Sequence, residues 1–287
     1  MDQAGLPTTL AGLTTEWLAV ELTAAGHLDG GIRRTRVEPH GVGHGLLATL
    51  GRVELDLEPG ATGPRSLIAK LAASSERSLA IAHGLDMYRR EVTFYRELAD
   101  RSPLSPAMAY VAALADDGAT FALLLEDLSD LRNVSQVAGF AVADLDRAVD
   151  ALGRHHARFW DASADEALTV FPTIDDPAMV DVLVPQVATA WPSLRADFAA
   201  DLPPAAMAFG DRLVDRLPAL IDGLARGPLT VCHGDYRPDN IFFDDVGGTV
   251  RTIDFQIAGR ARGGRDLGYL MTQSVTPPRR ADQERRV

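Results

Sequence analysis

Cysteine and lysine are almost absent from this chain of 287 residues. The single cysteine, Cys232, excludes an intramolecular disulfide and a zinc site built from cysteines. The single lysine among 28 basic residues is Lys70. Because lysine codons are rich in A and T, its rarity indicates a GC-rich bacterial genome. No stretch approaches the roughly 18 consecutive apolar residues that a membrane-spanning helix requires.

Positive charge is also scarce, with 28 basic residues against 40 acidic ones and a formal net charge of -12. Such acidity excludes sequence-independent nucleic-acid binding, which needs clustered Lys and Arg against phosphate. It also gives no attraction to an anionic membrane surface. The N-terminus lacks the basic region and apolar core of a secretory signal, so we expect a cytoplasmic protein without nucleic-acid or membrane partners. Composition leaves open whether it is a monomer or a dimer.

The chain does contain two stretches of different pattern, which indicate an α+β fold of two lobes. Up to residue 128, alternating segments predict an antiparallel sheet with one prominent helix over 76–99. Beyond it the pattern turns mainly helical, so we place an N-terminal lobe with its linker at 1–128 and a C-terminal lobe at 129–287. The predicted strands are 33–39, 52–57, 66–71, 108–114, 119–125, 229–232, 241–243 and 250–254, and the further helices are 8–25, 144–160 and 205–225.

The segment HGDYRPDN at residues 233–240, followed by Asp254, carries the sharpest chemical signal. Phosphoryl transfer has a loose transition state and relies on positioning and charge neutralisation. Asp235 would accept or orient the proton of a substrate hydroxyl, while Asn240 and Asp254 offer the hard oxygen ligands that Mg²⁺ takes from proteins. Asp235 and Asn240 share a tight loop and Asp254 ends the next hairpin, so we expect the three to converge. The competing interpretation is a set of ordinary turn residues.

These residues resemble a known family. HGDYRPDN followed by TIDFQIAGRARGGRDLGYL looks like the aminoglycoside phosphotransferase and choline kinase group of small-molecule kinases, with the ecdysteroid-kinase-like branch nearest. The segments YRREVTFYREL, LLLEDLSD and LGRHHARFW fit in the same order, and the resemblance covers residues 40–287. It implies a two-lobe, protein-kinase-like fold. It also implies transfer of a phosphoryl group from ATP or, alternatively, GTP, with Mg²⁺, to a hydroxyl of a small-molecule acceptor.

Lys70 and a helix glutamate are expected to grip the nucleotide phosphates. A kinase needs a lysine on a strand, held by such a glutamate, and Lys70 lies on a predicted strand. On the following helix, Tyr88 and Tyr95 belong to a buried stripe. Glu91 lies beside that stripe, whereas Glu97 falls on the opposite face. A carboxylate that faces the core needs a partner, so we predict a Lys70–Glu91 ion pair in preference to an exposed Glu91.

A glycine-rich turn and the linker complete the expected nucleotide site. Gly41, Gly43 and Gly45 lie between two predicted strands, where a kinase places the loop that covers the phosphates. A plain turn is the alternative. The pattern fails the dinucleotide-binding fingerprint, which precedes a helix. The resemblance further implies that the linker around Glu126 and Leu128 offers backbone groups to the adenine.

Three other polar residues are assigned structural roles. His156 lies on the apolar face of the predicted helix 144–160 and is expected to be a hydrogen-bonded core histidine. His233 is expected to brace the catalytic loop by hydrogen bonding. Asp266 is expected to cap a helix.

The sequence stops at Val287, soon after the segment DLGYL, where the resemblance implies further helices that wall the acceptor site. We therefore expect a shortened C-terminal lobe. The main prediction is a small-molecule kinase, and the residues do not identify its acceptor. The alternative is a nucleotide-binding pseudokinase, or a truncated non-catalytic module of the same fold.

Overall fold

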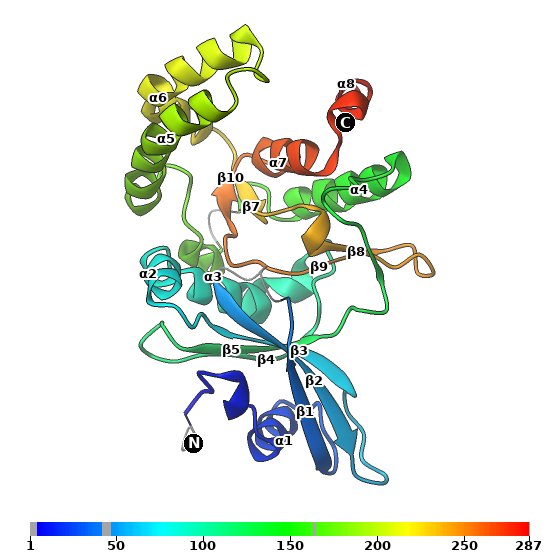
Figure 1. Ribbon diagram of the computed structural model, residues 1–287. Helices are drawn as coiled ribbons and strands as arrows, with labels where there is room; N and C mark the ends of the chain where they lie inside the picture. Colours follow the sequence, from blue (N-terminus) through cyan, green and yellow to red (C-terminus); the bar gives the residue numbers. More distant parts are fainter. Residues whose placement is uncertain (1–4, 42–46, 163–164, 287) are drawn as a thin grey trace.

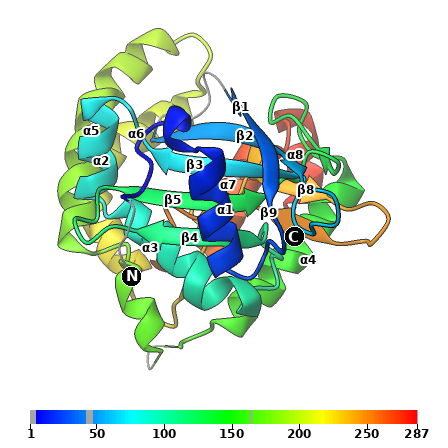
Figure 2. The same ribbon diagram turned by 90° about the horizontal axis from the view of Figure 1, so that it is seen from below.

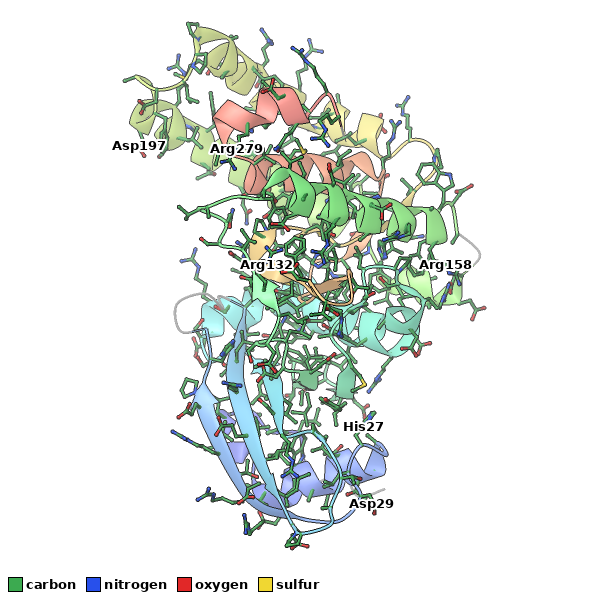
Figure 3. The ribbon with its side chains drawn as sticks, turned by 90° about the vertical axis from the view of Figure 1, so that its right-hand side faces the viewer. His27, Asp29, Arg132, Arg158, Asp197 and Arg279 are labelled. Carbon is green, nitrogen blue, oxygen red and sulfur yellow. The ribbon has the colours of Figure 1, made fainter. Side chains whose placement is uncertain are left out.

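The computed structural model describes residues 5–41, 47–162 and 165–286 and has two lobes (Figure 1). The N-terminal lobe is built on a five-stranded antiparallel sheet and the C-terminal lobe is mainly helical, which confirms the predicted α+β, two-lobe architecture. Figure 3 shows Asp29 at the sheet end, Asp197 at the helical end and Arg132 between them. Within the described ranges, no helix is both long and apolar enough to cross a membrane. The lobe boundary at residue 128 stays a prediction.

The strands of the N-terminal sheet are β1 (Ile32–Pro39), β2 (Ala48–Leu57), β3 (Ser66–Ala72), β4 (Ala109–Leu114) and β5 (Phe121–Glu126). Their order is β1-β2-β3-β5-β4, and all neighbouring pairs are antiparallel. Alternation separates the two faces, because on β2 Val53 and Leu55 are buried while Glu54 is exposed. All five strands predicted for this lobe are therefore present.

A short N-terminal segment covers the outer face of the sheet. It consists of a 3-10 turn, η1 (Leu10–Gly12), and α1 (Thr15–Ala24), which lies across the sheet in Figure 2. The Thr14 side chain caps α1 by accepting from Trp17 N at 3.2 Å. Gly26 ends this segment with a φ of +77°. The helix predicted over 8–25 is thus split in two, and its buried side chains pack on the apolar face of β2 and β3.

The helix predicted over 76–99 is also broken. It consists of α2 (Glu76–Gly84), α3 (Met87–Thr93), a π turn over Phe94–Leu98 and a 3-10 turn over Ala99–Arg101. The break between α2 and α3 falls at Asp86, whose φ of 50° is in the left-handed region. The predicted stripe survives, since Tyr88 and Tyr95 are buried, and Glu91 is fully buried on α3. The helix therefore carries a carboxylate into the interior, while Glu97 is exposed.

The C-terminal lobe contains α4 (Val142–Arg158), the 3-10 turn η4 (Glu166–Val170), α5 (Pro177–Asp197), α6 (Pro204–Leu224), α7 (Gly264–Ser274) and α8 (Pro277–Gln283). The predicted helices 144–160 and 205–225 correspond to α4 and α6. Helices α5 and α6 pair with each other and stand away from the rest of the lobe (Figure 1). Gly210 permits this contact, because a Cβ there would lie 2.0 Å from the Trp191 ring.

Short strands hold the loops that follow α6. β7 (Thr230–Cys232) pairs with β10 (Gly259–Ala261), while β6 (Arg132–Asn133), β8 (Ile241–Phe243) and β9 (Val250–Thr252) form a second small sheet. The predicted hairpin of 241–243 with 250–254 is confirmed as β8 and β9. Both sheets lie between the helices of the C-terminal lobe and the sheet of the N-terminal lobe (Figure 1).

One apolar core crosses the boundary between the lobes. Tyr88 and Phe121 of the N-terminal lobe share it with Phe255 and Leu270 of the C-terminal lobe. The Tyr88 and Phe121 rings stack with centroids 4.2 Å apart. Because apolar burial is the main driving force for association of such surfaces, this shared core holds the inner faces of the lobes together.

Candidate active site

Asp235 lies in the loop between β7 and the 3-10 turn η5 (Pro238–Asn240), and three side chains donate hydrogen bonds to its carboxylate. The Tyr269 hydroxyl lies 2.8 Å from Oδ1, and Asn240 Nδ2 lies 3.0 Å from Oδ2. Arg237 Nε spans the two oxygens at 3.0 and 3.1 Å. The Asp235 side chain is 16% exposed, so its orientation is fixed while it still reaches the surface.

Asn240 has its side-chain amide orientation set by two acceptors. Its Nδ2 donates to the main-chain oxygen of Asp235 at 2.9 Å as well as to the carboxylate. An amide nitrogen occupied in this way leaves Oδ1 as the atom able to meet a cation. The main-chain oxygen of Asn240 accepts from Ile253 N at 3.1 Å, which places the next residue, Asp254, alongside. The structure therefore brings the loop of Asp235 and Asn240 next to Asp254, and the roles of the three stay predictions.

Lys70 bridges two carboxylates at the junction of the lobes. Its Nζ lies 2.8 Å from Glu91 Oε1 and 2.9 Å from Asp254 Oδ1, so the expected Lys70–Glu91 ion pair is present. Burial alone would lower the pKa of Lys70, but Asp254 and Glu91 outweigh it and raise that pKa. Burial raises the pKa of Glu91 to about 7 although Lys70 opposes the shift. Burial also disfavours the charge of Asp254, yet Lys70 keeps the pKa of that carboxyl low.

Asp254 holds this position with a φ of 69°. That left-handed conformation is uncommon outside glycine, though Asp tolerates it better than most residues. Backbone strain of this kind persists only where the surrounding structure enforces it, and it concentrates at functional sites. Here the enforcing contacts are the ion pair with Lys70 and the β8–β9 hairpin that precedes Asp254.

His233 braces the loop from below, as the sequence predicts. Its Nε2 lies 3.0 Å from the Ile253 oxygen and therefore donates, while its Nδ1 accepts from Asp235 N at 3.3 Å. Burial lowers the pKa of His233, which favours this neutral form. His156 is likewise a hydrogen-bonded core histidine, with Nε2 3.1 Å from Asp266 Oδ2.

Asp266 does not cap a helix, contrary to the expectation. It lies in the first turn of α7 and accepts from the backbone instead, from His233 N at 2.7 Å and Gly234 N at 2.9 Å. Burial alone would raise its pKa, but His156 and these amides lower it to about 2. A buried carboxylate that accepts from two loop amides makes strong, charge-assisted hydrogen bonds. These bonds fasten α7 to the loop of Asp235.

Gly234 fits the loop because it has no side chain. Its φ is +86°, and a Cβ would lie 2.4 Å from the Ile257 oxygen. We expect Gly234→Ala to lower the free energy of unfolding by about 1–3 kcal/mol from backbone strain, and by more from the displaced Ile257 oxygen. Chemical denaturation measures it. Gly248→Ala is the matched control, since Gly248 has a φ of +72° with no atom within 4 Å; equal losses in the two variants would contradict the role of the close contact.

Arg90 fastens α3 to the segment that follows Asp254. It is 1% exposed, and its guanidinium donates to the main-chain oxygens of Ala258, at 3.2 Å, and Leu85. Next to it the rings of Phe94 and Phe255 stack with centroids 3.6 Å apart. Burial lowers the pKa of Arg90 to about 10, which still leaves it charged at neutral pH. Glu91 therefore reaches Lys70 from α3, a helix that the neighbouring Arg90 holds to the segment after Asp254.

The linker follows β5, the strand that pairs with β3 and so with the strand of Lys70. Glu126, the last residue of β5, receives a hydrogen bond from Met108 N at 3.1 Å and pairs with Arg251 of β9. Leu128 is 5% exposed, and its main-chain oxygen accepts from Leu131 N at 2.9 Å. A surface hollow of about 240 Å³ adjoins Glu126.

The glycine-rich turn is described only in part. Gly41 has a φ of +65° at the end of β1, as a turn requires. Gly43 and Gly45 lie outside the described residues. The role of the three glycines and of the linker in nucleotide binding stays a prediction.

Sequence reasoning missed three side chains around Asp235. Tyr269 comes from α7, 34 residues downstream, and Gln136 from the segment before α4, where it accepts from Arg237 NH1 at 2.7 Å. Arg237 lies two residues after Asp235, and a cation so close to the predicted base was the one available signal. Nothing in the local pattern around Tyr269 or Gln136 indicates their partner.

Comparison with known proteins finds a matching family model and similar folds. The sequence model of the phosphotransferase enzyme family matches residues 60–286. Among solved structures, the GDP and kanamycin complex of APH(2")-IIia has a TM-score of 0.55 at 13% identity, covering 91% of this chain and 78% of that one. The GDP complex of wild-type aminoglycoside 2'-phosphotransferase-IIIa has a TM-score of 0.51 at 13% identity, with the same coverage. No curated protein matches the chain.

At such identity the two structures establish the fold and nothing beyond it. The family match carries more, because residues 60–286 contain Lys70, Glu91 and Asp254 as well as the whole loop from His233 to Asn240. On that match, which spans most of its length, the chain belongs to the phosphotransferase enzyme family.

Proposed function

We propose that this protein transfers the γ-phosphoryl group of ATP, or of GTP, to a hydroxyl of a small molecule with the help of Mg²⁺. The observation that carries the proposal is the Lys70 ammonium, which bridges Glu91 and Asp254 next to the loop of Asp235 and Asn240. Phosphoryl transfer needs this set of a phosphate-binding cation, metal ligands and a base, held by the protein in fixed positions.

The residues present fit a magnesium ion. Asn240 has Oδ1 turned away from its two hydrogen-bond acceptors, and Asp254 uses only Oδ1 for Lys70. Both are oxygen donors of the type that Mg²⁺ accepts, with water and phosphate oxygens completing its shell. When bound, the ion would neutralise charge on the nucleotide phosphates. Asn240 and Asp254 are the residues that would hold it.

Lys70 would grip the nucleotide phosphates, and Glu91 would keep its ammonium in place. The turn of Gly41, Gly43 and Gly45 would cover the phosphates, and the backbone around Glu126 and Leu128 would contact the purine. The two similar structures contain GDP, which supports a nucleotide at this site. Backbone contacts alone do not distinguish adenine from guanine, so ATP and GTP both fit the proposal.

Asp235 would act as the base toward the acceptor hydroxyl. Its carboxylate reaches the surface while Arg237, Asn240 and Tyr269 fix its orientation. A base must lie within hydrogen-bond reach of the proton that it accepts, and such a fixed orientation prepares one oxygen for that contact. The kanamycin in one similar structure is a small molecule rich in hydroxyl groups, which agrees with an acceptor of this broad class.

Thermal unfolding with and without Mg·ATP tests the nucleotide site. At about 100 times its dissociation constant, the ligand should stabilise the wild type by roughly 2.7 kcal/mol. We expect Asp254→Ala to lose most of this increment, because it removes a metal ligand and a partner of Lys70. Asp150→Ala, which breaks an exposed ion pair on α4, should retain it.

A wild-type protein that gains no stability from Mg·ATP or Mg·GTP would refute the proposal. A gain in Asp254→Ala equal to that in the wild type would remove Asp254 from the metal site. Binding without transfer to any of a panel of hydroxyl compounds would instead favour the pseudokinase.

A further inference from the structure

When no acceptor is present, hydrogen-bond donors of the protein cover the Asp235 carboxylate, the base proposed above; these donors are called the cap. Four lone-pair sites are available on a carboxylate. At Asp235 they meet the Tyr269 hydroxyl on Oδ1, Asn240 Nδ2 on Oδ2, and Arg237 Nε between them. Asn240 and Arg237 come from the same loop as Asp235. Among the residues that the structure describes, only Tyr269 donates to it from another element, and it occupies the oxygen that Asn240 does not use.

One face of α7 builds this cap. Asp266, Tyr269 and Gln273 follow each other at helical spacing, so they project on the same side of the helix. Asp266 holds the amides of His233 and Gly234, and Tyr269 contacts Asp235 itself. Gln273 reaches Gln136, which in turn accepts from Arg237 NH1 at 2.7 Å.

The consequence is that α7 meets the catalytic loop at three points. Two of them, through Tyr269 directly and through Gln136 and Arg237, end on the Asp235 carboxylate. Asp266 is fully buried and fixes the first turn of the helix. The phenol is therefore not a loose side chain that happens to lie near the base, because its helix is anchored on either side of it.

We propose that Tyr269 is a positioning residue that keeps water off Asp235 until the hydroxyl of the acceptor replaces its phenol on Oδ1. The inference rests on the proposed function. Tyr269 would make the enzyme use the hydroxyl of the acceptor, and not water, as the nucleophile. In the absence of an acceptor, the phenol occupies Oδ1 of Asp235, where a nucleophile would otherwise bind. The bound nucleotide is then not hydrolysed.

The reaction that the cap suppresses is hydrolysis of the nucleotide. In it a water oxygen bonds to the γ-phosphorus, the bond from that phosphorus to the β–γ bridging oxygen breaks, and the nucleoside diphosphate leaves. The water proton passes to Asp235 and is then released to solvent. Water is thus an acceptor whose identity is known, and its reaction can be followed while the natural acceptor is unidentified.

The first experiment measures Mg·ATP hydrolysis without any acceptor. We expect Tyr269→Phe to hydrolyse ATP about fivefold faster than the wild type, the factor that one hydrogen bond of ordinary strength is worth. The added variant Asp235→Asn should abolish the gain. Tyr110→Phe is the matched control, since it removes the hydroxyl of a tyrosine on β4 whose ring packs against His27 and has no contact with Asp235. It should show no gain.

A gain of activity separates this role from a structural one, because a merely structural phenol predicts lower stability and slower hydrolysis. Equal rates in wild type and Tyr269→Phe, with Mg·ATP stabilisation intact in both, would overturn the inference and leave the proposed function standing. A wild type that is stabilised by neither Mg·ATP nor Mg·GTP would overturn both. A gain in Tyr110→Phe equal to that in Tyr269→Phe would also overturn the inference.

A second experiment needs no nucleotide. Burial and the contact with Asp235 raise the pKa of Tyr269 to about 12. With 3-fluorotyrosine at position 269, whose phenol is more acidic, fluorine NMR follows the titration in the free protein. We expect Asp235→Asn to lower this pKa, because it removes the negative charge that opposes ionisation. An unchanged pKa would show that the phenol does not contact Asp235 in solution and would overturn the inference.

Discussion

Asp235→Asn should lower the rate of phosphoryl transfer by about 10²–10⁴-fold, the range that a positioned general base contributes. Nucleotide binding should persist, because the contacts of Lys70, Glu91 and Asp254 do not involve Asp235. The substituted amide still accepts from Tyr269 but cannot take a proton. Steady-state release of ADP in the presence of an identified acceptor measures the rate, and thermal unfolding with Mg·ATP measures binding.

Asp150→Asn provides the control for this change, since it makes the same substitution on the exposed face of α4. It should leave both quantities unaltered. Turnover retained within a factor of two or so in Asp235→Asn would remove Asp235 as the base. Loss of nucleotide binding in the same variant would show that its effect is structural.

Lys70→Met should lower the free energy of unfolding by about 3–5 kcal/mol, the loss expected when one partner of a buried ion pair is removed. The variant leaves Glu91, which is fully buried, facing Asp254 without an intervening cation. Denaturant titration at several pH values measures the loss. The double variant Lys70→Met with Glu91→Leu should recover much of it, because it removes the uncompensated carboxylate as well.

The loss should also depend on pH. The pKa of Glu91 is raised to about 7 in the folded wild type, so the stability from its bound proton is present below the unfolded value of 4.5 and disappears as the pH rises toward 7. Without Lys70 that pKa rises further. The deficit of Lys70→Met should therefore widen as the pH rises above about 7, where Glu91 ionises in the wild type and stays protonated in the variant. A deficit that stays constant as the pH rises above 7 would argue that Glu91 is not a charged partner of Lys70.

Strands of the fold were more predictable than helices. The five strands of the N-terminal sheet alternate in polarity or form short apolar runs, and all appear where expected. The helix over 76–99 breaks at Asp86, which adopts a left-handed φ that its sequence does not announce. Helix α5 was missed because Pro185 and Pro192 lie inside it and none of its side chains is buried, so no apolar stripe marks it.

The residues of the site also differ in how far the sequence predicts them. Lys70, Glu91 and the loop from Asp235 to Asn240 were recognisable, because each combines a residue type with a local spacing that phosphoryl transfer demands. Tyr269 was not, since its partner lies 34 residues away and depends on how α7 docks. Asp266 was expected to cap a helix, because helix caps are predicted from the residues next to them in sequence. Its actual partners, the amides of His233 and Gly234, are supplied by the tertiary fold.

In some protein kinases, the helix that carries the glutamate corresponding to Glu91 swings outward in the inactive state and returns on activation. Here such a swing would take the Arg90 guanidinium from the Ala258 oxygen and pull apart the stacked rings of Phe94 and Phe255. Stripping a buried charge of its acceptors is costly. The ion pair of Glu91 with Lys70 thus forms when the chain folds and stays formed in the folded protein. The proposed enzyme would therefore need no separate activation step to bring Glu91 to Lys70.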